Sequence, residues 1–141
     1  MGQMPITKLN PYLFFNGDCA EAIAHYEQTL GAILESRQTF AEIPGAPPSP
    51  HGARIMKASL RVGPATVMLS DTHPDTPVPL GGNVDVMLDF DDAAETADRF
   101  ARLGEGGAVT MPLAEMFPGA SFGTVVDRFG VNWMFTCVTP L

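Results

Sequence analysis

One short pattern occurs twice in the chain, 74 positions apart, and it constrains the fold more than any other feature. An Asp opens each copy, at Asp18 and at Asp92, and a Glu follows three residues later, at Glu21 and at Glu95. This is the spacing of a capping box, in which the two side chains satisfy free backbone donors at the start of a helix. A glycine stop signal follows each predicted helix. The pattern predicts a duplicated unit with one helix in each half.

Strand-like segments surround both predicted helices. One run of strand-forming residues comes before each helix, at 12–15 and at 84–90. Turns that contain Gly, Pro or Asp divide the chain after each helix into further strand candidates. These lie at 33–43, 55–62, 66–70, 107–111, 121–126 and 131–138. Each half therefore predicts an α+β unit of the form βαβββ.

The two units are expected to form one domain over residues 1–141, a typical length for a single domain. We place the pseudo-repeats at approximately 7–71 and 83–139, with a proline-rich linker at 72–82. One helix covers only one face of a small sheet, so the other face must meet the second unit or a second chain. Two such sheets make a cleft, where small ligands usually bind. The sequence is compatible with a cleft completed within one chain or across a dimer.

Charge and missing motifs exclude several classes of protein. Eight Lys and Arg against sixteen Asp and Glu give a net charge of −8, the wrong sign for binding nucleic acid or an anionic membrane. The apolar runs are too short to cross a bilayer, and the N-terminus lacks a signal-peptide pattern. The chain has no glycine-rich phosphate-binding motif. We therefore expect a cytoplasmic protein without a nucleotide or methyl-donor domain.

Residues spread in order over nearly the whole chain match one known pattern. They are 12–17 (Tyr-Leu-Phe-Phe-Asn-Gly), Cys19, Glu21, Ala22, Tyr26, Leu30, Gly31, 67–71 (Val-Met-Leu-Ser-Asp), Met116, Phe117, Phe122, Gly123, Asp127, Phe129, Gly130 and Trp133. With these residues the chain resembles the vicinal-oxygen-chelate superfamily, which contains glyoxalase I, bleomycin-resistance proteins and extradiol dioxygenases. It is most similar to the PhnB-like branch of that superfamily.

The resemblance implies two βαβββ modules in tandem that form a cleft-shaped mixed sheet, and it implies a homodimer. Members of the PhnB-like branch are often called demethylubiquinone methyltransferases. We do not expect that activity, because nothing in this chain could hold a methyl donor by the usual fold.

The metal site of the superfamily is not expected here. Metal-dependent members place His, Glu or Gln on four strands around one divalent ion. By ungapped matching, those positions are held by Pro11, Met68, Asp85 and Met134. Only Asp85 offers a hard oxygen, and a single carboxylate cannot replace the water shell of a divalent cation. We therefore expect no metal and no other cofactor.

The candidate ligand-binding residues are one acid, three methionines and two aromatics. They are Asp85, Met87, Met68, Met134, Phe117 and Phe122. Alternation along 84–90 puts Asp85, Met87 and Asp89 on one face, where a buried Asp85 would have a raised pKa and could act as a base or pair with a cation. Methionines line adaptable pockets, although they also fill cores. Phe117 and Phe122 bracket a predicted mobile loop.

Other ionisable side chains have weaker cases for chemistry. Asp85 and Asp89 are separated by about 13 Å of strand, so a second acid would have to come from Glu115 or Asp127. Asp127 lies in a predicted turn, and we expect it to stabilise that turn rather than to take part in catalysis. We expect all three histidines to lie at the surface, although His51 would reach the cleft if its proline-rich loop acts as a lid.

The sequence favours a small-molecule-binding protein with a mostly apolar, metal-free cleft that carries one acidic group. An acidic chain suits a cationic or amphipathic ligand, because the negative charge steers and pairs with cations. One alternative is a divalent-metal-dependent lyase, isomerase or dioxygenase. A further alternative is a structural or regulatory interaction module. The sequence does not decide whether any reaction is catalysed.

Overall fold

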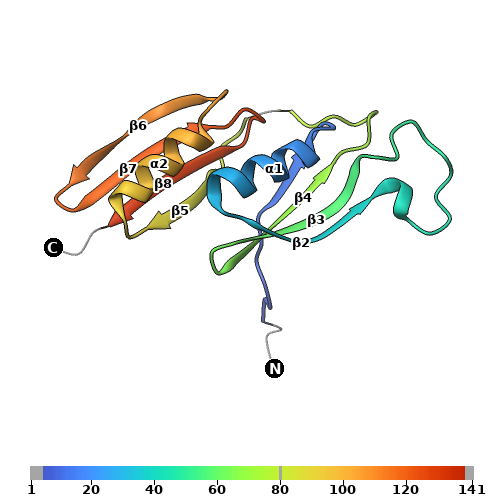
Figure 1. Cartoon of the computed structure of the whole chain (residues 1–141), viewed down its shortest axis with the longest axis horizontal. Helices are drawn as coiled ribbons and strands as arrows, with labels where there is room; N and C mark the ends of the chain where they lie inside the picture. Colours follow the sequence, from blue (N-terminus) through green and yellow to red (C-terminus); the bar gives the residue numbers. More distant parts are fainter. Residues whose placement is uncertain (1–4, 80, 139–141) are drawn as a thin grey trace.

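The computed structural model describes residues 5–79 and 81–138 and contains two modules with the same order of elements (Figure 1). The first comprises β1 (Tyr12–Phe15), α1 (Cys19–Leu30), β2 (Ile33–Thr39), the short helix η1 (Phe40–Glu42), β3 (Ile55–Val62) and β4 (Ala65–Asp71). The second comprises β5 (Val86–Phe90), α2 (Ala93–Leu103), β6 (Ala108–Phe117), β7 (Ala120–Val126) and β8 (Asn132–Val138). The sheet orders are β1-β4-β3-β2 and β5-β8-β7-β6. The predicted α+β fold of tandem βαβββ modules is confirmed.

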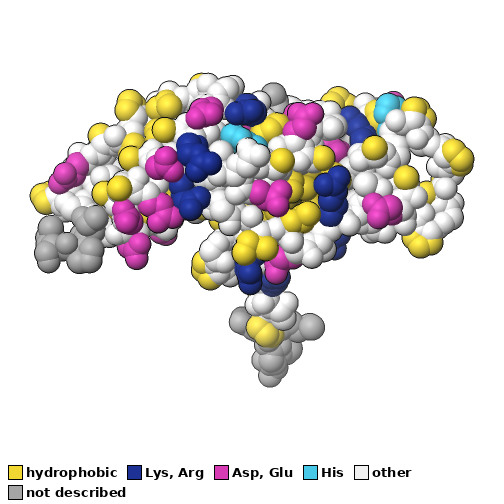
Figure 2. All heavy atoms as spheres, in the orientation of Figure 1, with side chains coloured by type: hydrophobic (Ala, Val, Ile, Leu, Met, Phe, Trp, Pro, Cys, Tyr) yellow, Lys and Arg dark blue, Asp and Glu magenta, His cyan; other side chains and the backbone are white. Residues whose placement is uncertain are grey.

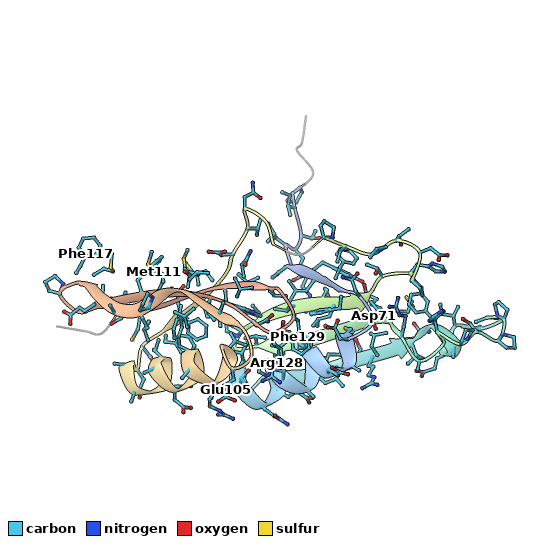
Figure 3. The ribbon with its side chains drawn as sticks, turned by 90° about the horizontal axis from the view of Figure 1, so that it is seen from above. Asp71, Glu105, Met111, Phe117, Arg128 and Phe129 are labelled. Atoms are coloured by element: carbon cyan, nitrogen blue, oxygen red, sulfur yellow. The ribbon has the colours of Figure 1, made fainter. Side chains whose placement is uncertain are left out.

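Both helices cover the same side of the two sheets (Figures 1 and 3). The core lies between the helices and the sheets and includes Tyr26 of α1, Phe100 of α2 and Trp133 of β8. Acidic and basic side chains gather on the outer surface of the helices (Figure 2). We call the opposite side of both sheets, away from α1 and α2, the open face. Within the described chain, neither helix is long and apolar enough to cross a membrane.

The two modules are offset differently in their strands and in their helices. Tyr12 of β1 pairs with Met68 of β4, and Met87 of β5 pairs with Met134 of β8, so Tyr12 corresponds to Met87, 75 positions later. The helices instead begin at Cys19 and 74 positions later, at Ala93. The first module thus has one extra residue between its strand and its helix. An offset of 74 applied to the strands would turn every side chain to the wrong face.

The second module departs from the predicted strand ends in β5 and β6. β5 begins at Val86, two residues later than predicted. β6 continues to Phe117 instead of ending at Met111. β6 continues through Pro112 because it is an edge strand, where a proline need not interrupt a ladder hydrogen bond. Phe117 therefore precedes a tight hairpin turn with Gly119 at φ +77°, and Phe122 lies within β7, so the two rings do not bracket a loop as predicted.

The N-termini of the two helices are capped differently. Asp92 caps α2 as predicted, because its side chain accepts hydrogen bonds from the backbone N–H groups of Ala94 and Glu95. Asp18, the predicted cap of α1, makes no side-chain cap bond, and its backbone (φ −109°, ψ 21°) lies outside the extended conformation usual at an N-cap. The expected capping box at α1 is therefore wrong.

Asp71, at the end of β4, replaces Asp18 as the cap of α1. Its Oδ1 accepts hydrogen bonds from the N–H groups of Gly17 (2.9 Å) and Cys19 (3.0 Å). Its Oδ2 accepts one from the N–H of Ile55 (2.9 Å). One buried carboxylate thus holds the start of α1 and the start of β3 against the end of β4.

Asp127 joins the two modules. Its Oδ1 accepts hydrogen bonds from the backbone N–H groups of Phe129 and Val131, which confirms the predicted turn-forming role. Its Oδ2 accepts from the Tyr26 hydroxyl of α1 (2.6 Å) and from Nε1–H of Trp133 (2.9 Å). Asp127 is only 3% exposed, so four donors, two of them buried side-chain groups, depend on one buried carboxylate.

The seam between the helices holds a further contact that the sequence did not predict. His25 of α1 is buried, and its Nε2 lies 3.2 Å from the carbonyl oxygen of Leu103 at the end of α2. Arg102 of α2 donates to the carbonyl oxygen of Gln28 of α1 (2.6 Å). The predicted surface position of His25 is therefore wrong, because the second module covers that turn of α1.

We expect the stability of the fold to decrease at alkaline pH. Burial raises the pKa of the Cys19 thiol from 9.0 to about 12, with a smaller contribution from the Asp71 carboxylate. Burial, and next the Asp127 carboxylate, raise the pKa of Tyr26 well above 10.0. Above about pH 9 the unfolded chain therefore releases protons that the folded chain keeps, so the free energy of unfolding falls by up to about 1.4 kcal/mol per pH unit for each group.

Urea unfolding at a series of pH values from about 8 to 12 checks this expectation. Tyr26→Phe removes one of the two groups, so its free energy of unfolding is expected to fall less steeply above about pH 10 than that of the wild type. Equal slopes in the two proteins would contradict a protonated Tyr26 in the fold.

Candidate functional site

Four of the six predicted ligand-binding residues lie on the open face of the second sheet. Met87 and Met134 are opposite each other in β5 and β8, and Phe122 of β7 is opposite Thr136 of β8. Residues paired across a ladder point to the same side of a sheet. Phe117 of β6 also points away from α2 (Figure 3). The register therefore brings two thioethers and two aromatic rings onto one surface.

An apolar pocket of about 360 Å³ lies at the outer end of this surface. Its lining includes Phe117, Phe122, Met116 and Thr136. Met116 and Phe117 are 57% and 71% exposed, which is unusual for side chains of this size. In a single copy of the chain, the apolar wall of this pocket is exposed to water and is therefore available to an apolar ligand.

Asp89 lies beside this pocket without lining it, because it contacts Thr136, which does line it. It is opposite Thr136 in the β5–β8 ladder, and the Thr136 hydroxyl donates a hydrogen bond to its Oδ1. Asp85, the predicted acid, lies just before β5 and is exposed, so its expected burial is not found. The alternation along β5 had placed Asp89 on the correct face. Its position beside the pocket depends on the register between β5 and β8, which the sequence does not contain.

Met68 lies on the open face of the other sheet. It is in β4, between Tyr12 of β1 and Ser59 of β3, and it is half-buried. The chain does not bring Met68 into the pocket beside Phe117 and Phe122. A cleft that includes both groups has to span both sheets.

The remaining acids considered from the sequence are not part of this site. Glu115 accepts a hydrogen bond from the N–H of Gly119 (3.1 Å) and is exposed at the β6–β7 hairpin. Asp127 is buried and engaged by four donors in the core. His51 lies in the loop between η1 and β3, at the end of the molecule away from β6 (Figure 1).

The side chains at the metal positions that the resemblance implies do not suit a hard divalent cation. Ungapped matching gave Pro11 and Asp85 beside Met68 and Met134, but Pro11 and Asp85 are 74 positions apart, and the strand offset of 75 corrects this. The open-face partners of Met68 and Met134 are Tyr12 and Met87, a phenol and a third thioether, while Asp85 is exposed before β5. Hard cations prefer several oxygen or imidazole ligands at once. Among the residues that the structure describes, no group of three His, Cys, Asp or Glu side chains is placed to hold a metal ion.

Comparisons with known proteins agree with this architecture. Protein YjdN of Escherichia coli (strain K12) is 35% identical over 140 residues, which cover 92% of this chain and 95% of that protein. The crystal structure of protein PA1353 from Pseudomonas aeruginosa is 41% identical, covers 96% of this chain and 100% of its own, and superposes with a TM-score of 0.86.

A PhnB protein from Bacillus cereus, described as a putative 3-demethylubiquinone-9 3-methyltransferase, is 21% identical. It covers 94% of this chain and 100% of its own with a TM-score of 0.78, which shows a shared fold. Residues 8–135 match the sequence pattern of a single family. The chain therefore belongs to the Glyoxalase/Bleomycin resistance protein/Dioxygenase superfamily.

Proposed function

We propose that this protein is a cytoplasmic small-molecule-binding member of its superfamily, with a mostly apolar cleft on the open face and no divalent metal. The observation that carries the proposal is the pocket beside Phe117 and Phe122, in which aromatic and thioether groups form the wall. Flexible thioethers allow such a wall to adapt to ligands of different shape. Met87, Met134 and Met68 extend the same kind of surface across both sheets.

The charge at the pocket supports a cationic or amphipathic ligand. Asp89 lies at its edge through the hydrogen bond with Thr136, and Asp85 lies four residues earlier in the chain, exposed before β5. The described residues that line the pocket include no Lys or Arg. The net charge of −8 attracts cations over a longer range. An aromatic ring bearing a quaternary ammonium group matches both the apolar wall and this charge.

We further propose that the open face is covered in a homodimer. Phe14 of β1 is 52% exposed and Met87 of β5 is 53% exposed, so both sheets present large apolar side chains on this side. Contiguous apolar surface of this kind usually marks an interface or a binding site. A second copy would bring an open face opposite the first and could complete the cleft that spans both sheets. Sedimentation equilibrium is expected to give twice the 15.0 kDa mass of the chain.

The main competing function is a metal-dependent lyase, isomerase or dioxygenase. The side chains that pair on the open face at these positions, Tyr12 with Met68 and Met87 with Met134, do not favour it, because they offer three thioethers and one phenol. Elemental analysis of protein purified without chelators distinguishes the two functions. A stoichiometric divalent ion held by several protein oxygens or nitrogens would contradict the proposal and support the enzyme.

A pair of probes with one shape tests the charge preference. (4-Hydroxyphenyl)trimethylammonium and 4-tert-butylphenol differ by a single positive charge. We expect the cation to bind about fivefold more tightly at low ionic strength, because it lies near Asp89 and its ring contacts the apolar wall. Isothermal titration calorimetry on both probes measures the ratio.

The variant Asp89→Asn should remove the difference between the two probes while leaving the binding of 4-tert-butylphenol unchanged. Asp98→Asn, an exposed acid on the outer side of α2, makes the same change of charge outside the pocket and should leave the ratio intact. Equal affinities in the wild type, or equal effects of the two variants, would overturn the assignment of Asp89.

A further inference from the structure

A second pocket lies in the first module, at the end of the molecule farthest from β6. The segment between β2 and β3 forms an arm there, which includes η1 (Figure 1). The base of the arm is closed by backbone hydrogen bonds from Phe40 N–H to Arg54 O (3.0 Å) and from Ala41 N–H to Gly52 O (2.9 Å). Together with residues 73–74 of the linker, the arm encloses a pocket of about 420 Å³. That volume is within the range of small-molecule sites.

The pocket combines an apolar wall with cationic and imidazole side chains. Phe40, Ile43 and Pro47 contribute to the wall, and Arg54, His51 and His73 lie among its polar lining. None of the described residues that line the pocket is acidic. This is unusual in a chain with sixteen acidic and eight basic residues. The local charge is therefore opposite to that of the protein as a whole.

The Arg54 guanidinium retains donors for a ligand. Its Nη1 donates to the carbonyl oxygen of Thr72 (2.7 Å), which fixes the side chain at the pocket. Within the described residues, no carboxylate forms an ion pair with it. Arg54 is half-buried, so part of its charge has lost water without forming an ion pair in return. A planar guanidinium of this kind is suited to bind a carboxylate through two parallel hydrogen bonds.

The imidazole of His73 can add a further donor. The N–H of Asp75 lies 3.3 Å from Nδ1 of His73, so the neutral ring carries its proton on Nε2. Asp75 also lies beside this ring, with Oδ2 3.5 Å from Nδ1, but it is exposed and does not line the pocket. His51 brings a second imidazole from the other proline-rich segment.

We propose that this pocket binds a small organic anion that carries one carboxylate on an apolar, preferably aromatic, body. The carboxylate pairs with Arg54, and the apolar body packs against Phe40 and Ile43. The site is separate from the open-face pocket, which is lined from β6, β7 and β8. This site prefers an anion, whereas the open-face pocket is proposed to prefer a cation, so ligands of opposite charge distinguish the two sites.

The test uses naphthalene-2-carboxylate and its neutral isostere naphthalene-2-carboxamide as probes with the full-length protein. We expect the carboxylate to bind at least about fivefold more tightly at low ionic strength, because a charged hydrogen bond to Arg54 is lost in the amide. Arg54→Gln should remove this preference. Arg37→Gln, which makes the same charge change at an exposed position of β2 outside the pocket, should preserve it.

A second variant tests the pocket independently, in case Arg54→Gln fails to fold. Ala46→Trp fills the pocket and leaves the Arg54 side chain unmutated, so it should abolish the binding of both probes at an unchanged melting temperature. No measurable binding of the carboxylate by the wild type would overturn the proposal. Binding that survives Ala46→Trp, or a preference that survives Arg54→Gln, would also overturn it by placing the anion elsewhere.

Discussion

The variant Asp127→Ala is expected to lower the free energy of unfolding by about 3–5 kcal/mol. The substitution leaves the buried Tyr26 hydroxyl and Trp133 indole N–H without an acceptor, together with two partly buried backbone N–H groups. The melting temperature should fall by roughly 10–15 °C for a chain of this length. Urea titration followed by Trp fluorescence measures the change, since the only tryptophan, Trp133, is bonded to Asp127.

Asp98→Ala is the matched control for this prediction. Asp98 is exposed on α2 and only 3.7 Å from Arg102 in a surface ion pair, so its loss should change the free energy of unfolding by less than about 0.5 kcal/mol. Tyr26→Phe removes one of the four donors to Asp127. Its loss in free energy of unfolding should lie between those of the other two variants, at about 1 kcal/mol. A cost below about 1 kcal/mol for Asp127→Ala would show that this carboxylate does not hold the modules together.

The second large effect is expected at Asp71. Asp71→Ala should lower the free energy of unfolding by about 2–4 kcal/mol, because the N–H groups of Gly17, Cys19 and Ile55 lose a buried acceptor. Asp18→Ala is the sharpest comparison, since Asp18 occupies the N-cap position but makes no side-chain cap bond. Its removal should cost less than about 0.5 kcal/mol, measured by urea unfolding. The reverse order of the two costs would contradict the assignment of Asp71 as the cap.

The contrast between Asp18 and Asp71 shows what the sequence could predict about the fold. Helix periodicity and the stop signals are local, so both helices and the order of elements follow from the sequence. The carboxylate that caps α1 comes from a strand more than fifty positions later, and no local spacing identifies it. The burial of His25 has the same cause, because the residue that covers it, Leu103, belongs to the other module.

For the candidate site too, the sequence predicted local features but not contacts between distant segments. Alternation along β5 correctly placed Met87 and Asp89 on one face. Which of the acids lies beside the pocket depends on the pairing with Thr136 in β8, forty-seven positions away. Phe117 lies at a hairpin because β6 runs beyond the predicted end at Met111 and continues through Pro112, which an edge strand tolerates. The polar arrangement around Arg54 joins two loops that are distant in sequence, so it could be found only in the structure.

Methyl NMR of methionine tests most directly whether the open face of the second sheet binds a ligand. The protein is labelled with [methyl-13C]methionine and titrated with (4-hydroxyphenyl)trimethylammonium. We predict that the methyl signals of Met87, Met116 and Met134 shift with a single dissociation constant, while that of Met56 in β3 stays unchanged. Shifts confined to Met56, or saturation of the protein without any shift at Met116 and Met134, would contradict a ligand site on this surface.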